Sequence, residues 1–307
     1  MKNRKLKFID LFAGIGGTRI ALERNGARCV FSSEWDLECQ KTYYANFREK
    51  PTGDIQKIIE SELPDFNILV AGFPCQPFSS VGKREGFKHA EGTLFYDIAR
   101  ILNYKKPEAF LLENVPGLKN HDNGETFKLI IKILKELNYS VFYKILDAKD
   151  FGVPQKRKRV YIVGFSDNIY NKKINFEFPV GSKENMYINE FLESNVSGYT
   201  ISKHLQESYL FKKNDGLPEI IDQNSKIQVK TLVSTYHKIQ RLTGTFVKDG
   251  ETGLRLLTKN ECKAIMGFPK DFIIPVSRTQ MYKQLGNSVA IPVVEEISKV
   301  LIKKLQG

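Results

Sequence analysis

The first 165 residues alternate strand-like and helix-like segments, and this rhythm limits the possible folds more than any other feature of the sequence. Apolar, strand-like runs occur at 7–12, 28–33, 66–71, 109–113, 141–146 and 159–165. Helix-like segments lie between them, at 18–25, 37–47, 93–104 and 125–137. Successive strand–helix units place mostly parallel strands in one sheet, with helices on its faces. We therefore expect an α/β fold.

The composition and the pattern of the sequence change near Asp167. Residues 167–240 are polar, rich in Asn and Lys, and lack the strand–helix rhythm, which predicts a second, smaller and irregular domain. The end of the chain, 289–305, has the pattern of an amphipathic helix with lysines in its last turn, as the helix dipole favours. We expect domains at 1–168 and 169–277, with 278–307 returning to the first.

The chain carries a strong positive charge and few cysteines. Its formal net charge of +12 favours a polyanionic partner, although a solvated basic surface is the alternative. The cysteines, at 29, 39, 75 and 262, form no C-x-x-C pair, so neither a zinc site nor a disulfide framework is expected. Apolar runs are too short to span a membrane and no signal core is visible, which predicts a soluble, cytosolic protein.

Cys75 follows the apolar run 66–70 inside the sequence Phe-Pro-Cys-Gln-Pro. A second strand-like run, 109–112, ends at Glu113. The carboxyl ends of parallel strands meet at one edge of a sheet, where ligands bind. A thiol beside a proton donor suits covalent attack on an electron-poor ring. The alternative is a buried structural cysteine, but the polar residues after Cys75 favour an exposed loop.

A glycine-rich segment, Phe12-Ala13-Gly14-Ile15-Gly16-Gly17, joins the first strand to the first helix. Glu34 ends the second strand, where a carboxylate can accept the hydroxyls of a ribose. Trp35 could stack on an adenine and Asp54 could accept from its amino group, so an adenosine-type cofactor is expected. The alternatives are a tight structural turn, a half-buried tryptophan and a turn aspartate.

Two further motifs are visible. Arg157 and Arg159 alternate at the start of a strand, so they share a face and could hold a phosphate or a carbonyl; charged guards of a solvated strand edge are the alternative. The segment 284–289 predicts a turn that opens the last helix, with Asn287 or Ser288 as its N-cap.

In this order and context, these motifs resemble the cytosine-C5 DNA methyltransferases, and residues 8–165 look like the bacterial HhaI-type enzymes. The resemblance rests on segments 8–17, 34–36, 53–55, 72–76, 113–115, 155–159, 255–269 and 286–289. It fails in about 168–240, where the family places its target-recognition region. It implies a Rossmann-like methyltransferase sheet with an antiparallel edge strand, and a target-recognition domain at 169–277.

Carried over residue by residue, the resemblance assigns the following roles. The catalytic residues would be Cys75 as nucleophile, Glu113 as the acid at the base, and Arg157 and Arg159 as supports. The S-adenosylmethionine contacts would be Phe12, Gly14, Gly17, Glu34, Trp35, Asp54, Ile55, Pro74, Leu94, Asn287 and Ser288. One departure is Val81, where the HhaI-type relative has serine.

Contacts with DNA are expected from two parts of the chain. The loop from about 76 to 92 is glycine-hinged and basic enough to close over DNA. Base readout is expected in about 195–255, where polar side chains that suit base edges and phosphates gather. The candidate DNA-binding residues in these two parts are Ser79, Lys83, Arg84, Arg241, Thr243, Gly244 and Thr245.

The resemblance implies a DNA (cytosine-5-)-methyltransferase that uses S-adenosylmethionine and no metal, and flips its target base out of double-stranded DNA. We expect a monomer on DNA in a bacterial cytosol, in a restriction-modification or orphan modification role, with a cognate restriction endonuclease as a candidate partner. A tRNA cytosine-C5 methyltransferase and a non-catalytic DNA-binding relative are the alternatives. The presence of Cys75, Glu113, Arg157 and Arg159 together argues against the second.

Overall fold

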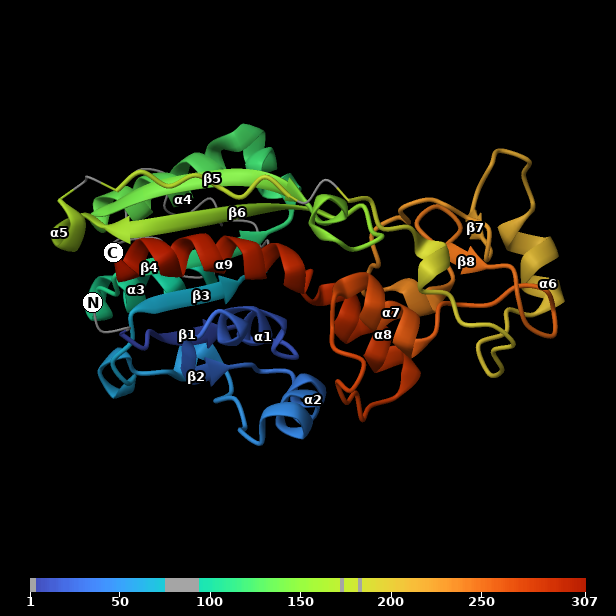
Figure 1. Ribbon diagram of the computed structural model, residues 1–307, viewed down its shortest axis with the longest axis horizontal. Helices are drawn as coiled ribbons and strands as arrows, with labels where there is room; N and C mark the ends of the chain where they lie inside the picture. Colours follow the sequence, from blue (N-terminus) through green and yellow to red (C-terminus); the bar gives the residue numbers. More distant parts are fainter. Residues whose placement is uncertain (1–3, 75–93, 172–173, 182–183) are drawn as a thin grey trace.

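A computed structural model describes residues 4–74, 94–171, 174–181 and 184–307. Figure 1 shows a larger part built on one sheet and a smaller part with little regular structure, joined end to end. Among the described residues, no helix is both long and apolar enough to cross a membrane.

The central sheet has the strand order β2-β1-β3-β4-β6-β5. The first four of these strands run parallel, whereas β6 is antiparallel to both of its neighbours. The prediction of a mostly parallel sheet with an antiparallel edge strand is therefore confirmed: the edge strand β5 pairs antiparallel with β6, and β6 is the strand whose direction is reversed. The bounds are β1 Lys7–Leu11, β2 Arg28–Ser33, β3 Ile68–Gly72, β4 Ala109–Asn114, β5 Tyr139–Asp147 and β6 Lys158–Ser166.

Helices cover both faces of this sheet because successive strand residues point to opposite faces. In β1, Phe8 enters the core shared with the helices α1 and α9, whereas Ile9 enters the core shared with α3 and α4. Figure 1 shows α9 lying across the sheet on the first of these faces. The bounds are α1 Gly17–Arg24, α2 Leu37–Phe47, α3 Leu94–Lys105, α4 Glu125–Glu136 and α9 Ile291–Gln306.

The chain does not leave the sheet at residue 168. The short helix α5 (Asp167–Tyr170) is followed by Phe176, which is buried and packs on Phe142 and Phe165 with ring centroids 6.0 and 5.6 Å apart. The sequence 174–178 thus still contributes aromatic rings to the core of the larger part. The predicted division at 168 and 277 stays a prediction, with this segment on the sheet side.

The smaller part is organised by a buried arginine because it has few strands or helices of its own. Arg255 is fully buried and forms ion pairs with Asp249 at 2.8 Å and Glu261 at 2.9 Å. It also donates to the Glu193 carbonyl at 2.7 Å. These bonds fasten irregular segments that are far apart in sequence. The regular elements here are α6 Lys203–Leu205, β7 Glu219–Ile221, β8 Thr245–Val247, α7 Lys259–Met266 and α8 Arg278–Asn287.

The prediction for the start of the last helix was wrong. Asn287 is the final residue of α8, and the Ser288 N–H donates back to the Gln284 carbonyl, so this turn closes a helix. The last helix, α9, begins at Ile291. Pro292 fixes that start, since proline suits a first helical turn, where its missing N–H would have no partner.

Candidate active site

The carboxyl ends of β3 and β4 lie side by side and form the floor of the candidate site. Gly72 pairs with Glu113 across the two strands. The Asn114 side chain donates to the Phe73 carbonyl at 2.9 Å and so ties the strand ends together. Cys75, like Ser79, Lys83, Arg84 and the rest of the loop 76–92, lies outside the described residues. Residues 72–74, the last described residues before Cys75, leave the sheet beside Glu113 and Asn114.

Glu113 is held in place by Arg159 and is largely removed from water. Its Oε1 lies 3.0 Å from Nε of Arg159, and the Glu113 side chain is 16% exposed. Burial raises the pKa of Glu113, and the positive charges of Arg159 and Arg157 partly oppose the rise. A carboxyl with a raised pKa holds its proton at higher pH, as a general acid requires. The sequence prediction of a proton donor at this edge fits this geometry.

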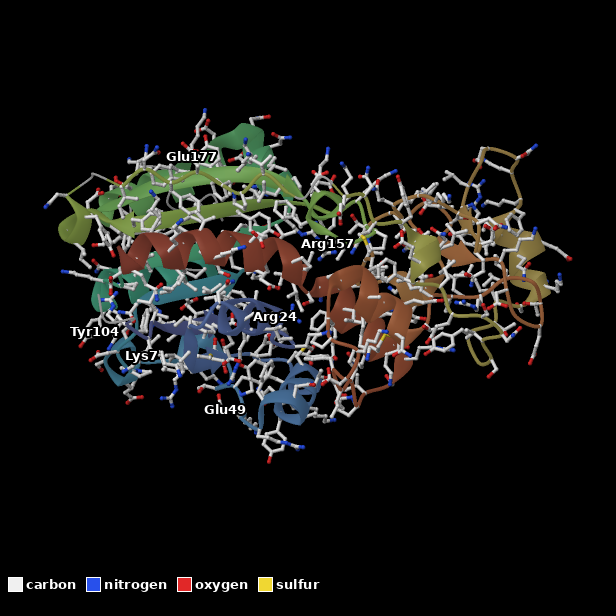
Figure 2. All side chains as sticks on the ribbon, in the orientation of Figure 1. Lys7, Arg24, Glu49, Tyr104, Arg157 and Glu177 are labelled. Atoms are coloured by element: carbon white, nitrogen blue, oxygen red, sulfur yellow. The ribbon has the colours of Figure 1, made fainter. Side chains whose placement is uncertain are left out.

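Arg157 ties three segments of the chain together at the junction between the larger and smaller parts, where Figure 2 labels it. Its guanidinium donates to the carbonyls of Leu232 and Gly286 at 3.0 Å each and of Ser288 at 2.6 Å. Its Nε is buried and has no partner among the described residues. The carbonyl bonds give Arg157 a bracing role that the sequence did not indicate. The predicted contact with Cys75 or the cytosine stays a prediction, for which Nε remains available.

Glu34 stands at the end of β2 with its carboxylate fixed by two backbone amides. Oε2 accepts from the Gly14 N–H at 2.8 Å, and Oε1 accepts from the Asp36 N–H at 2.8 Å. Burial raises the pKa of Glu34, while these amide bonds oppose the rise. A carboxylate has about four acceptor positions, so each oxygen can still accept a hydroxyl. Next to it, Trp35 is 76% exposed, so the half-buried alternative is wrong and its ring faces are available for stacking.

The glycine-rich loop has open space next to Gly14 and is closely packed at Gly17. Phe12, Gly14 and Gly16 have positive φ values of 57°, 56° and 87°, a conformation that glycine adopts with little strain. A Cβ on Gly14 would meet nothing within 4 Å. A Cβ on Gly17 would lie 2.8 Å from Oγ of Ser288. The loop is therefore pressed against the end of α8, which brings two predicted cofactor segments together.

The remaining predicted cofactor residues differ in burial and in the elements on which they lie. The Glu34 N–H donates to the Thr52 carbonyl at 2.9 Å, which places the turn containing Asp54 near Glu34. One oxygen of Asp54 caps that turn by accepting from the Gln56 N–H at 3.1 Å. The predicted contact of Asp54 with the adenine amino group stays a prediction. Ile55 is buried in the core next to α3. Pro74 is exposed at the end of β3, Leu94 begins α3, and Asn287 ends α8.

The candidate DNA-binding residues of the small part divide into exposed and buried side chains. Thr243 is exposed, whereas Gly244 and Thr245 are buried. Arg241 is also buried, and its guanidinium donates to the Leu210 carbonyl at 2.9 Å and to the Lys213 carbonyl at 3.1 Å, and pairs with Asp215. The prediction that Arg241 contacts DNA therefore conflicts with the structure, because the side chain is buried and its Nε and Nη2 already donate inside the small part.

The structure also contains polar residues near the site that the sequence interpretation missed. Lys283 pairs with Asp36 at 2.8 Å, and Thr42 donates to buried Gln284 at 2.8 Å, so α8 is fastened to the helix that follows Trp35. Asp10 in β1 is fully buried and its carboxyl has no hydrogen-bond partner among the described residues. A lone acid inside the apolar run 8–12 was the signal that could have identified it.

No group of three or more His, Cys, Asp or Glu side chains in the described ranges has the arrangement needed to hold a metal ion. The site instead combines the buried Glu113 carboxyl with Arg157 and Arg159. Beside the glycine-rich loop it also presents Glu34 and Trp35, which together are called the carboxylate–tryptophan wall. Such a site suits group transfer between a bound nucleoside-type cofactor and a base.

Solved structures share this fold. The chain aligns with the methyltransferase EhMeth of Entamoeba histolytica at a TM-score of 0.78 and 25% identity, covering 99% of this chain and 100% of that chain. The Dnmt2 methyltransferase of S. pombe, at 21% identity, aligns with a TM-score of 0.79 over 99% of this chain and 100% of that chain. At that identity the second likeness shows the fold alone. The fold is that of a methyltransferase.

Sequence comparison then gives the family. The model for C-5 cytosine-specific DNA methylases matches residues 6–303. The Type II methyltransferase M.MspI of Moraxella sp is 62% identical over 95% of this chain and 69% of that protein. M.BsuFI of Bacillus subtilis is 58% identical over 98% of this chain and 73% of that protein.

The chain therefore belongs to the C-5 cytosine-specific DNA methylase family and is a DNA (cytosine-5-)-methyltransferase. The family resemblance seen in the sequence is confirmed, whereas a particular closeness to HhaI-type enzymes is not shown.

Proposed function

We propose that this enzyme methylates C5 of a cytosine within a short specific site of double-stranded DNA, as the modification component of a bacterial Type II restriction-modification system. The observation that carries the chemistry is the Glu113 carboxyl, buried against Arg159 at the strand end next to Gly72. The role in restriction-modification is supported by relatives named Type II methyltransferases at 62% and 58% identity. The same relatives do not favour the tRNA alternative.

The proposed chemistry begins with the poor nucleophilicity of cytosine C5. The Cys75 thiolate adds to C6 while Glu113 gives its proton to N3, so that C5 becomes enamine-like. S-adenosylmethionine, when bound, supplies the electrophilic methyl group that C5 takes up. Water then takes the C5 proton, the C5–C6 double bond re-forms as the sulfur leaves C6 as the Cys75 thiolate, and N3 returns its proton to Glu113, so that the aromatic ring is restored. A base in a duplex is out of reach of Cys75, so the cytosine has to leave the helix first.

The residues that would hold S-adenosylmethionine are those of the carboxylate–tryptophan wall and the glycine loop. Glu34 would accept the ribose hydroxyls and Trp35 would stack on the adenine, while Gly14 leaves room above the loop. Phe12, Gly17, Asp54, Ile55, Pro74, Leu94, Asn287 and Ser288 complete the proposed set. The free acceptor capacity of Glu34 and the exposure of Trp35 fit such a ligand.

The biological setting is part of the same proposal. We infer that the enzyme acts as a monomer on DNA in the cytoplasm of a bacterium, alongside a cognate restriction endonuclease. The region 195–255 would read the target sequence. Sequencing of methylated genomic DNA from cells that express the chain would identify the site.

Covalent trapping tests the reaction directly. A duplex with 5-fluorocytosine at the target should trap the wild-type enzyme, because fluorine at C5 blocks the elimination step. Cys75→Ser should bind the same duplex without forming the covalent adduct, since a hydroxyl is a much weaker nucleophile than a thiolate. Trapping of Cys75→Ser would assign the nucleophile elsewhere. Methyl transfer to tRNA and not to DNA would refute the substrate.

A further inference from the structure

The helix α2 follows the edge strand β2 on the side of the larger part that faces α8 (Figure 1), and few of its apolar side chains are fully buried. Of its 11 residues, Gln40, Thr42 and Tyr43 are buried, and two of these three side chains are polar. Leu37 and Tyr44 are 67% and 52% exposed. Burial of an apolar face is what usually fixes a helix on its sheet. The position of α2 therefore depends largely on its polar contacts.

These polar contacts join α2 and its N-cap to the segment 273–284, at both ends of the helix and in its middle. We call them the α2 interface. They are the Asp36–Lys283 ion pair at 2.8 Å, the Thr42–Gln284 hydrogen bond at 2.8 Å, and two hydrogen bonds between the Asn46 side chain and the Ile273 backbone at 2.7 and 2.8 Å. Thr42 and Gln284 are both buried, so this hydrogen bond is shielded from water. In Asp36, Oδ2 takes Lys283 while Oδ1 caps α2.

The other side of the α2 interface is fixed by the smaller part. In α8, the buried Tyr282 hydroxyl donates to the Leu257 carbonyl at 2.5 Å. Gly286 lies so close to the segment 233–234 that a Cβ on it would be 2.4 Å from the Ser234 nitrogen. The Gly286 carbonyl also accepts from Arg157 at 3.0 Å. Because α8 is held in these ways, it provides a rigid support for α2.

The start of α2 in turn fixes the Glu34 carboxylate. Glu34, Trp35 and Asp36 form the whole link between the end of β2 and the start of α2. The Asp36 N–H donates to Oε1 of Glu34 at 2.8 Å, and the Gln40 side chain donates to the Glu34 carbonyl at 2.5 Å. A shift of α2 away from α8 would move Asp36 and Gln40, and with them the carboxylate.

We propose that Lys283 and Thr42 are positioning residues for cofactor binding: through the α2 interface they hold Glu34 in the orientation that accepts the ribose hydroxyls of S-adenosylmethionine. The inference rests on the proposed function, since it requires Glu34 to bind the ribose. It adds that affinity for the cofactor depends on side chains outside the proposed cofactor set. An acceptor that is already oriented binds more tightly, because less ordering is needed when the ligand arrives.

Calorimetry with S-adenosylmethionine alone tests the proposal. Lys283→Met and Thr42→Val should each raise the Kd about three- to tenfold, whereas Lys283→Arg and Thr42→Ser, which keep the polar group, should stay within about twofold of wild type. Single-turnover methylation by Lys283→Met at saturating cofactor should also stay within about twofold, because the defect lies in binding. Lys283 is 46% exposed, so its replacement leaves the fold intact even if Thr42→Val lowers the unfolding temperature. Lys128→Met is the matched control, since Lys128 forms an exposed pair with Glu125 on α4 and should leave the Kd unchanged.

Two readouts separate positioning from a general loss of stability. In the Glu34→Ala background, Lys283→Met should change the Kd by about twofold or less, because its effect acts through Glu34. Trp35 is the only tryptophan in the sequence and lies between Glu34 and Asp36, so its fluorescence reports on this link directly. The fluorescence anisotropy of Trp35 without cofactor should fall in Lys283→Met and not in Lys128→Met.

The outcomes distinguish this inference from the proposed function. An unchanged Kd for Lys283→Met, an equal rise in Kd with and without Glu34, or an unchanged Trp35 anisotropy would overturn the positioning role and leave the cofactor site intact. A wild-type protein that does not bind S-adenosylmethionine, or an unchanged Kd for Glu34→Ala alone, would instead overturn the proposed cofactor site, and the positioning role with it.

Discussion

Replacing Glu34 tests the proposed contact between its carboxylate and the ribose of S-adenosylmethionine. The expected change in Kd follows from the hydrogen bonds that would be lost. Its carboxylate already accepts from the Gly14 and Asp36 amides, each at 2.8 Å, so the side chain is fixed before any ligand arrives. Glu34→Ala removes the proposed acceptor of both ribose hydroxyls. Hydrogen bonds to a charged group contribute about 1.5–3 kcal/mol, which corresponds to an increase of about 10- to 150-fold in the Kd of S-adenosylmethionine.

Calorimetry with S-adenosylmethionine and no DNA measures this change without the contribution of catalysis. Glu34→Gln should give an intermediate loss, because its amide nitrogen cannot accept from a backbone N–H or a hydroxyl. Glu62→Ala is a matched control, since Glu62 is an exposed acid in a separate 3₁₀ turn. An unchanged Kd for Glu34→Ala would mean that the ribose is held elsewhere, and the assignment of this wall would be wrong.

Two further predictions concern the buried acids. Glu113→Gln keeps the shape of the side chain but cannot deliver a proton, so single-turnover methylation should slow by about 10²-fold or more, and a near-normal rate would remove Glu113 from the mechanism. For Asp10, burial raises the pKa of the folded state to about 8 from an ordinary value of 3.8. The contribution of Asp10 to the free energy of unfolding is therefore complete below pH 3.8, where the carboxyl is protonated in both states, and is lost as the pH rises toward 8. Relative to Asp10→Asn, the wild type should therefore lose about 2 kcal/mol of unfolding free energy between pH 6 and pH 8 in urea titrations, and parallel pH profiles would contradict this.

Several features follow from the sequence because they depend on neighbouring residues. The alternation of strand-like and helix-like segments gives the central sheet, since apolar periodicity and turn residues act over a few positions. The position of Glu113 at a strand's carboxyl end also follows, because Glu113 comes directly after the apolar run 109–112. For the same reason Glu34 was identifiable at the end of β2, where its carboxylate is found near the glycine loop.

Other features depend on contacts between distant residues, which no local pattern encodes. The sequence 284–289 predicted the start of a helix, whereas in the structure the Ser288 N–H donates back to the Gln284 carbonyl at the end of α8, and α9 begins at Ile291 with Pro292 in its first turn. Arg157 gained its bracing role only because residues 75 to 131 positions away bring carbonyls to its guanidinium.

The clearest difference between sequence and structure lies at Arg241 and Leu242. By residue type, the arginine is the expected DNA contact and the leucine the expected core residue. The tertiary structure reverses this assignment, because carbonyls near residues 210–217 surround the guanidinium and leave the leucine in solvent. Composition and periodicity thus determined the sheet and the ends of its strands, whereas the side of an irregular loop that faces outward was decided by which buried partners satisfy its polar groups.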